Sequence, residues 1–312
     1  MCFTHHFWDY FIPGVANGFL YALIALGYTL VYGVLQLINF AHSEVFMSGG
    51  FGALFVLNWA IGSRHPSGVE SVGYVIIGIV AGALAGAFIA FVLERVAYRP
   101  LRRRHAPKLA FLISAIGMSY FLYNLAGKEF GRDTRTIKAP FTITPSKPLF
   151  KIFGTSVNLY DAVIAIVAIG MLIVLDRIVN STRLGQGIRA VAQDADTAAL
   201  MGVDINRVIS QTFIIGGLLG GAAGFLFGLG TAGVSYTMGF TPGLKAFTAA
   251  VLGGIGNIRG AMLGGLLLGV IENLSSPCFG ANWVDVVSFY ILVLVLLVRP
   301  TGILGEKLGR SA

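Results

Sequence analysis

This chain has few charged residues and almost no cysteine. Only 12% of its 312 residues are charged, against about 25% in ordinary soluble domains, whereas 56% are apolar and the mean hydropathy is +0.80. Its two cysteines, Cys2 and Cys278, have neither the spacing of a metal site nor that of a redox motif, so no disulfide framework is implied. The composition therefore excludes an ordinary soluble domain and predicts a polytopic membrane protein.

Motifs for catalysis and metal binding are also missing from the sequence. No GxxxxGK[ST] phosphate-binding loop occurs, and the nearest Gly-Lys pair, Gly127-Lys128, is followed by Glu129. His42 and Glu44 are too few for a metal site. We therefore expect a protein that binds no cofactor or metal and does not hydrolyse ATP itself. An intramembrane hydrolase remains an alternative class, although no triad spacing supports it.

The net charge of +8 comes from basic residues placed beside apolar runs. The largest short cluster, at residues 99–108, lies directly between two such runs, which is typical of cytoplasmic loops rather than of nucleic-acid binding. The first ten residues contain no Lys or Arg and no small-residue cleavage site, so a cleavable signal peptide is not expected.

Apolar runs of about 20 residues, the length of one membrane crossing, predict an all-α bundle of transmembrane helices. Nine spans fit best, with eight or ten left open. The predicted spans are 11–35, 45–62, 72–97, 109–127, 157–179, 207–231, 243–258, 260–276 and 283–299.

Alternation of these spans places the loops at 99–108 and 183–204 on one side, taken as cytoplasmic, with the N-terminus outside and the C-terminus in the cytoplasm. The loop at 128–156 opposes this assignment, because it is basic and yet falls outside. Its basic residues are Lys128, Arg132, Arg135, Lys138, Lys147 and Lys151, and we interpret Pro140, Pro145 and Pro148 as signs of a structured external excursion.

A polar segment, residues 183–204, separates two long apolar runs. Its apolar residues recur at helical spacing, namely Ile188, Val191, Ala192, Ala195 and Ala199. Asp194 or Asp196 is suited to N-cap a short helix, and Gly202 to end one. These capped amphipathic helices predict a surface on which a partner docks. The alternative is an interfacial helix lying flat on the bilayer.

Glycine is unevenly distributed, and its main cluster predicts close helix packing. Gly216, Gly220, Gly224 and Gly228 repeat every fourth residue, with Gly217 and Gly221 beside them, and Gly78, Gly82 and Gly86 repeat the pattern earlier. Small residues let helix backbones approach closely in lipid. A third glycine-rich stretch, 243–273, predicts either a broken helix lining a cavity or a turn between two spans at the interface.

Polar residues in the first span share one predicted helical face, namely Asn17, Tyr21, Tyr28, Tyr32 and Asn39. Such a face avoids lipid. It predicts either packing through hydrogen bonds between helices or a substrate path. The ionisable residues near span ends favour anchoring or pairing over a proton relay; they are Glu44, Glu94, Asp161, Lys245, Glu272 and Asp285.

Three stretches resemble the permease subunits of branched-chain amino acid ABC importers: NGFLYALIALGYTLVYGVLQLINFAHSEVFMSGG (17–50), RLGQGIRAVAQDADTAALMGVDINRV (183–208) and GLKAFTAAVLGGIGNIRGAMLGGLLLGVIEN (243–273). The resemblance covers nearly the whole chain and implies one permease domain, 1–312, in a bacterial inner membrane. It also implies a second, homologous permease, two cytoplasmic ATPases that use ATP and Mg, and a periplasmic protein that binds leucine, isoleucine or valine.

The segment 183–204 resembles the part of that family that contacts the ATPases. The residues that the resemblance assigns to coupling are Gly187, Arg189, Asp194, Ala195, Ala198, Ala199 and Gly202. Thr197-Ala198-Ala199 stands where Glu-Ala-Ala is expected. Urea and short-chain amides are alternative substrates, because importers of these compounds use similar permeases, and a secondary transporter is an alternative class.

Overall fold

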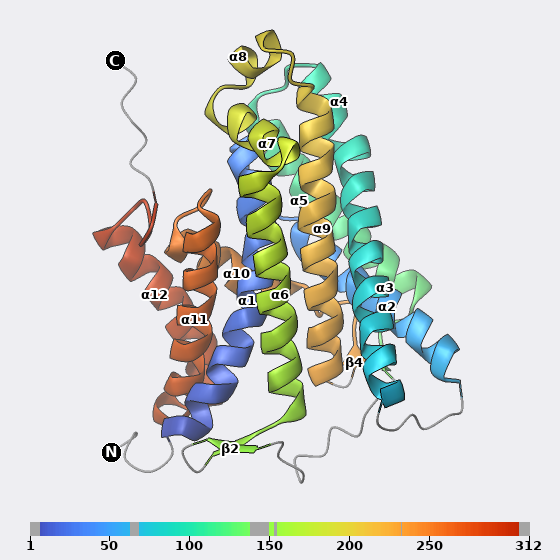
Figure 1. The fold of residues 1–312 in the computed structure, drawn as a ribbon, viewed down its shortest axis with the longest axis vertical. Coiled ribbons are helices and arrows are strands. Elements are labelled where there is room, and N and C mark those ends of the chain that lie inside the picture. Colours follow the sequence, from blue (N-terminus) through green and yellow to red (C-terminus); the bar gives the residue numbers. More distant parts are fainter. Residues whose placement is uncertain (1–6, 63–68, 138–149, 153–154, 232, 306–312) are drawn as a thin grey trace. The chain divides into compact units, whose positions relative to one another are not determined.

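The computed structural model describes residues 7–62, 69–137, 150–152, 155–231 and 233–305 (Figure 1). This part of the chain is helical, with two pairs of very short strands. Seven of its helices are long and apolar enough to cross a membrane. The prediction of an all-α, polytopic bundle is thus consistent with the structure.

The seven long spans are α1 (Phe7–Leu35), α2 (His42–Ile61), α3 (Val69–Leu93) continued by the π-helical η1 (Glu94–Tyr98) and α4 (Arg99–Arg103), α5 (Lys108–Glu129), α6 (Leu159–Ser181), α9 (Ile205–Gly230) and α11 (Ile258–Phe279). The shorter helices are α7 (Arg183–Gln193), α8 (Ala195–Leu200), α10 (Phe240–Gly253), η2 (Ala281–Trp283) and α12 (Val284–Val298). The antiparallel strand pairs are β1 (Arg135–Thr136) with β4 (Gly233–Val234) and β2 (Phe150–Ile152) with β3 (Thr155–Val157).

Each of the nine predicted spans coincides with a helix, but two of these helices are short. α10 has 14 residues and α12 has 15. At 1.5 Å per residue they are roughly 21 and 23 Å long, less than the roughly 30 Å hydrocarbon core of a bilayer.

The chain forms two compact units. The first unit comprises Met1–Thr29, Thr144–Ile173 and Leu244–Ala312, and the second comprises Leu30–Ile143 and Val174–Gly243.

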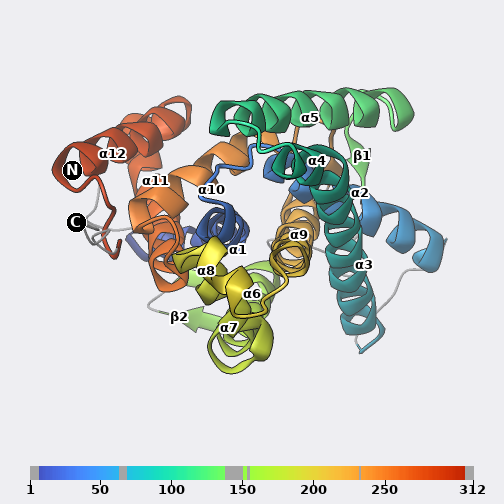
Figure 2. The same ribbon diagram turned by 90° about the horizontal axis from the view of Figure 1, so that it is seen from above.

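Glycines bring α2, α3 and α9 of the second unit into close contact, and these helices lie side by side in Figure 2. A Cβ atom added at Gly82 of α3 would lie 2.8 Å from the carbonyl oxygen of Gly221, and one at Gly217 would lie 2.9 Å from Cα of Ala87. Such distances leave no room for a side chain. α9 therefore touches α3 backbone to backbone.

The four glycines of the predicted repeat are all buried on α9. Three of them, Gly220, Gly224 and Gly228, lie against residues that do not belong to α3. A Cβ at Gly220 would meet the ring of His42 at 3.1 Å, and one at Gly224 would meet the backbone of α2 at Phe46 and Gly50. Gly228 faces the side chains of Ile137 and Val234 at 3.0 Å. The contacts with α3 are made instead by the neighbouring Gly217 and Gly221.

Two contacts show which segments of the chain meet at each end of the second unit. At one end the guanidinium of Arg102, in α4, donates to the amide oxygen of Asn206, at the start of α9, at 3.1 Å. At the other end β1 pairs with β4, so the chain segments that follow α5 and α9 lie together. Residues 99–107 and 204–207 therefore share one end of the unit, as the predicted alternation requires. Lys138, Pro140, Pro145, Lys147 and Pro148 of the basic loop lie outside the described residues.

In the first unit, the glycine-rich stretch forms a turn between α10 and α11. Gly254 and Gly256 adopt positive φ angles of 106° and 96°, and the side chain of Asn257 accepts a hydrogen bond from the Gly260 amide and caps α11. The amide of Asn257 also donates to the carbonyl of Leu304 at 2.9 Å, so the segment after α12 covers this turn. This geometry agrees with the interfacial-turn alternative.

An ion network joins three helices of the first unit. The Lys245 ammonium, in α10, lies 2.6 Å from Glu272 of α11 and 2.7 Å from Asp285 of α12. The Lys245 side chain is buried, and a buried charge needs such partners. The expected pairing of ionisable residues is confirmed for these three.

A test of the glycine contacts is to replace Gly224 by Leu. Because the added side chain would collide with the backbone of α2, we expect loss of about 3 kcal/mol or more of folding free energy, at or above the usual range for overpacking, and hence little folded protein. Gly73→Leu is the control, because no atom lies within 4 Å of a Cβ at that position on α3. The measurement is the monodisperse fraction after detergent extraction. An equal yield of the two variants would contradict the packing.

Candidate functional site

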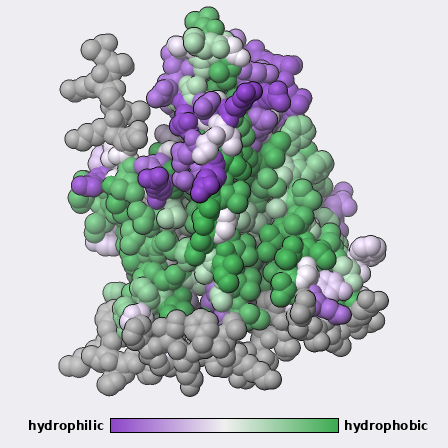
Figure 3. All heavy atoms as spheres, viewed as in Figure 1, coloured by the Kyte–Doolittle hydropathy of each residue, from purple (hydrophilic) through white to green (hydrophobic). Residues whose placement is uncertain are grey.

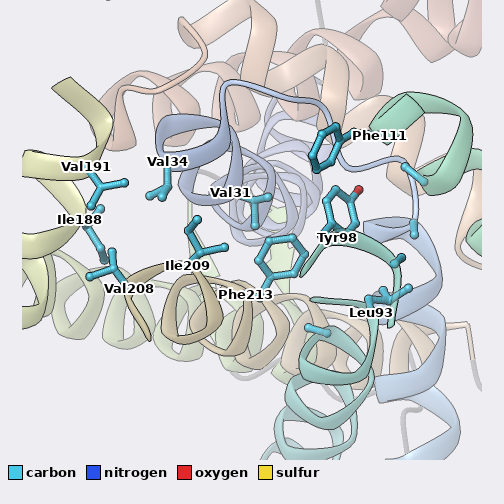
Figure 4. Close-up of a cluster of buried hydrophobic side chains, with 14 of the residues drawn as sticks. Val31, Val34, Leu93, Tyr98, Phe111, Ile188, Val191, Val208, Ile209 and Phe213 are labelled. Atoms are coloured by element: carbon cyan, nitrogen blue, oxygen red, sulfur yellow. The ribbon is translucent and has the colours of Figure 1, made fainter. Parts of the chain in front are cut away.

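The segment 183–204 folds into two short capped helices at the end of the second unit that carries α4. Thr182 begins α7 by accepting a hydrogen bond from the Gly185 amide at 3.1 Å. The apolar side of α7 is buried, and Figure 4 shows Ile188 and Val191 next to Val208 of α9. α7 is thereby fixed to α9 through a hydrophobic cluster.

Two of the predicted coupling residues hold this segment to its own chain. The guanidinium of Arg189 donates a hydrogen bond to the carbonyl of Val179 in the last turn of α6. Gly187 lies against α9, where an added Cβ would be 3.0 Å from the side chain of Val208. Arg189 and Gly187 therefore connect α7 to α6 and α9.

Asp194 ends α7 and begins α8, which confirms the predicted N-cap. Its backbone is extended, with φ −156° and ψ 109°, and Oδ1 accepts hydrogen bonds from the amides of Asp196 and Thr197 at 3.0 and 3.1 Å. The Thr197 hydroxyl donates to Oδ2 at 2.6 Å. These hydrogen bonds, chiefly those from Thr197, lower the pKa of Asp194.

Gly202 ends α8, as the sequence predicts. Its φ of +86° is in the left-handed region that favours glycine. The amides of Gly202 and Val203 donate to the carbonyls of Ala199 and Ala198, each at 3.0 Å, so two of the last carbonyls of α8 are satisfied.

The three alanines assigned to coupling do not share one exposure. Ala198 is buried in the core of the second unit at 5% exposure, Ala195 is half-buried and only Ala199 is exposed. The most exposed apolar side chains here are Leu200, at 88%, and Met201, at 81%. Figure 3 shows a hydrophobic patch at the tip of this end, above a belt of hydrophilic side chains.

Leu200 and Met201 were missed by the prediction. They lie off the apolar stripe that packs α7, so helical periodicity does not single them out. The signal for them is different: two large apolar residues directly precede a glycine that ends a helix, in a segment that is otherwise polar at its surface.

The residues of the predicted polar face on the first span are distributed over both units. In the first unit, the Tyr21 hydroxyl donates to Glu272 at 3.2 Å, and the ring of Tyr28 packs edge-on against Phe247 with centroids 6.1 Å apart. Both tyrosines are buried. Asn17 of the same face is half-buried.

The prediction that Asn39 shares this face is wrong. α1 ends at Leu35, and Gln36 adopts φ +50°, so the chain has left the helix before residue 39. Asn39 is buried in the second unit, where its side-chain oxygen accepts hydrogen bonds from the Tyr98 hydroxyl at 2.9 Å and from the Ala41 amide at 3.1 Å. Tyr32, also in the second unit, is half-buried on α1.

Residues 11–296 match the family model described as the permease component of branched-chain amino acid transport systems. The chain belongs to this family. This permease is 41% identical to the high-affinity branched-chain amino acid transport system permease protein LivH of Escherichia coli K12, over 96% of each chain. It is 42% identical to the corresponding protein BraD of Pseudomonas aeruginosa, over 97% of each chain.

A more distant relative comes from an archaeon. The probable branched-chain amino acid transport permease protein LivH of Methanocaldococcus jannaschii is 28% identical over 93% of this permease and 91% of its own length. No solved structure matches the chain.

The cap of α8 can be tested by replacing Asp194 in this permease. Its lowered pKa means that the cap stabilises the helix fully above the unfolded pKa of Asp and is lost as the pH falls through the folded value. At pH 7 we therefore expect Asp194→Ala to increase amide hydrogen exchange at 196–203 several-fold. Asp194→Asn, which still accepts a hydrogen bond, is the control and should preserve most protection. Equal exchange in both variants would contradict the capping role.

Proposed function

We propose that this chain is the membrane-spanning permease subunit of an ABC importer for branched-chain amino acids. ATP is hydrolysed by two partner ATPase subunits in the cytoplasm, and α8 is the surface on which one of them docks. The observation that carries this proposal is the exposed pair Leu200 and Met201 at the tip of a doubly capped helix.

A protein partner explains this pair better than the bilayer surface does. Interfacial helices carry Lys and Arg on the polar face and bury a broad apolar face in lipid. α8 has only six residues, no basic residue, and two acidic groups, Asp194 and Asp196, at its start. Anionic lipids at the cytoplasmic surface would repel these carboxylates, whereas a hydrophobic cavity on an ATPase would accept two apolar side chains.

The connections of this segment suggest how movement is transmitted. When ATP closes the two ATPases, a pull on α8 passes to α7 across the single extended residue Asp194. α7 is bound to α6 through Arg189 and to α9 through Ile188 and Val191. The pull therefore reaches two transmembrane helices, and we propose that they rock around a path between this permease and a second, homologous one.

The proposed topology has nine spans, an external N-terminus and a cytoplasmic C-terminus, in a bacterial inner membrane. The contact between Arg102 and Asn206 at one end of the second unit, and the pairing of β1 with β4 at the other, support alternation of its spans. In the first unit, the amide of Ile303 donates to the carbonyl of Leu252 at 2.9 Å, so the C-terminal ends of α10 and α12 meet, as two crossings in the same direction require.

The relatives support branched-chain amino acids over urea or short-chain amides. The LivH and BraD permeases are named for branched-chain amino acid transport and match over nearly their whole length. We propose that a periplasmic binding protein delivers leucine, isoleucine or valine to the pair of permeases. ATP and Mg act in the ATPases, and this chain binds no cofactor of its own.

Docking is tested by the double variant Leu200→Asp, Met201→Asp. Burying two carboxylates in an apolar cavity is strongly unfavourable, so we expect transport and co-purification of the ATPases to fall at least about tenfold, since even 1.4 kcal/mol of lost binding has that effect. The measurement uses the purified complex in lipid. Leu297→Ala is the control, because Leu297 is similarly exposed, at 80%, on the apolar α12. Undiminished transport by the double variant would contradict docking at α8.

Topology is tested with single cysteines in a protein lacking Cys2 and Cys278. A cysteine at Arg103 should react with an impermeant thiol reagent only after the cells are opened, because α4 lies at the end that carries α7 and α8. A cysteine at Arg132, an exposed residue near β1, should react in cells with only the outer membrane permeabilised. The reverse pattern would invert the orientation.

A further inference from the structure

Glu44 is a buried carboxylate inside a membrane-spanning helix. It lies in the first turn of α2, and the residue is only 2% exposed. Ionisable residues at such positions in membrane proteins are usually functional, and their partner identifies the function.

Among the described residues, Glu44 differs from the buried Glu94 and the half-buried Glu272 in having no positively charged partner. Glu94 is paired with Arg102, and Glu272 with Lys245, each at 2.6 Å. In the described part of the chain, Glu44 receives only hydroxyl hydrogen bonds, from Ser119 at 3.1 Å and from Ser43 at 3.3 Å. Both end on Oε1, so Oε2 keeps its acceptor capacity.

The surroundings of Glu44 come from three parts of the second unit. Ser119 belongs to α5, and one turn further along α5 the ring of Tyr123 packs against Tyr236, with centroids 4.9 Å apart. Gly239, three residues after Tyr236, is pressed against the carbonyl of Ser43. The faces of aromatic rings attract cations, and hydroxyl oxygens can accept hydrogen bonds from an ammonium group.

We propose that Glu44 binds the α-ammonium group of the transported amino acid. This inference rests on the proposed function and names the group that recognises the substrate. A primary ammonium has three donors, which one carboxylate and neighbouring hydroxyl oxygens satisfy. A metal ion fits less well, because hard cations require six or more oxygen ligands, and no group of three or more His, Cys, Asp or Glu side chains occurs among the described residues.

Substrate reaches Glu44 only if α5 moves. Ser119 of α5 donates to Oε1, beside the free Oε2, and Glu44 as a whole is nearly inaccessible. The Ser119 hydroxyl therefore covers the carboxylate, and displacement of α5 would open it to the substrate.

The first experiment measures ATP-driven leucine uptake by the purified complex in proteoliposomes. Glu44→Gln keeps the shape of the side chain and removes its charge, so we expect uptake to fall at least about tenfold, the usual effect of losing a charged hydrogen bond. Ser119→Ala should give a smaller loss. Ser48→Ala is the control, because among the described residues the Ser48 hydroxyl bonds only to the carbonyl of Val45 in its own helix. Its uptake should equal that of the parent.

The second experiment separates recognition from a structural role and needs no variant. The hydrophobic reagent dicyclohexylcarbodiimide modifies carboxyl groups inside membranes, and mass spectrometry locates the label at Glu44 in the same purified complex that is used for uptake. Leucine and leucinamide, which keep the ammonium, should reduce labelling of Glu44. 4-Methylpentanoate, which keeps the side chain and carboxylate but lacks the ammonium, should not.

The outcomes distinguish this inference from the proposed function. Normal uptake by Glu44→Gln, or equal protection by leucine and 4-methylpentanoate, would overturn the ammonium site while leaving the importer intact. Absence of ATP-driven leucine uptake by the parent complex would instead overturn the proposed function.

Discussion

Close backbone contact between helices is the interaction on which the second unit depends. In lipid, helices are not driven together by the hydrophobic effect, so their association relies on van der Waals contact and hydrogen bonds. Gly82 and Gly86 of α3 meet Gly217 and Gly221 of α9 with no side chain between the backbones. α2 completes the group through Gly49, which also lies against Gly221. These positions tolerate few residues other than glycine, because even one added methyl group would displace a neighbouring backbone.

The segment 183–204 takes its position from this group of helices. α9 begins at the capping residue Asp204, whose side chain accepts a hydrogen bond from the Arg207 amide at 3.1 Å. One turn later, Val208 and Ile209 form the surface on which α7 packs. A rigid α9 therefore fixes α7, and the cap at Asp194 fixes α8 relative to α7. The departure from the expected Glu-Ala-Ala pattern also gains a reason, because the Thr197 hydroxyl is part of that cap.

The sequence predicts the features that depend on local chemistry. Apolar length predicts the seven long helices, and the caps at Asp194 and Gly202 follow from residue type. Features that depend on distant residues were not predictable. α1 ends at Leu35 because the next residue, Gln36, adopts a positive φ although it is neither Gly nor Pro, so the prediction places Asn39 on the wrong face. Likewise, exposure of Leu200 and Met201 depends on which side of α8 packs against the core, and a six-residue helix has too few positions to show that periodicity.

Buried charge gives the clearest distinction between structural and functional polar groups in this chain. Lys245 lies between two carboxylates on different helices, which joins α10, α11 and α12 of the first unit. Glu94 fastens η1 to α4 through Arg102 and also accepts a hydrogen bond from Ser210 of α9 at 2.8 Å. Both arrangements pair opposite charges and hold helices together, although Oε2 of Glu272 and Nη1 of Arg102 have no hydrogen-bond partner among the described residues. Glu44 satisfies only part of its hydrogen-bonding capacity, through two hydroxyls, so its surroundings do not balance its charge. Since burial of an unbalanced charge is strongly unfavourable in a membrane, a cation bound during the working cycle, as proposed above, would balance the charge of Glu44.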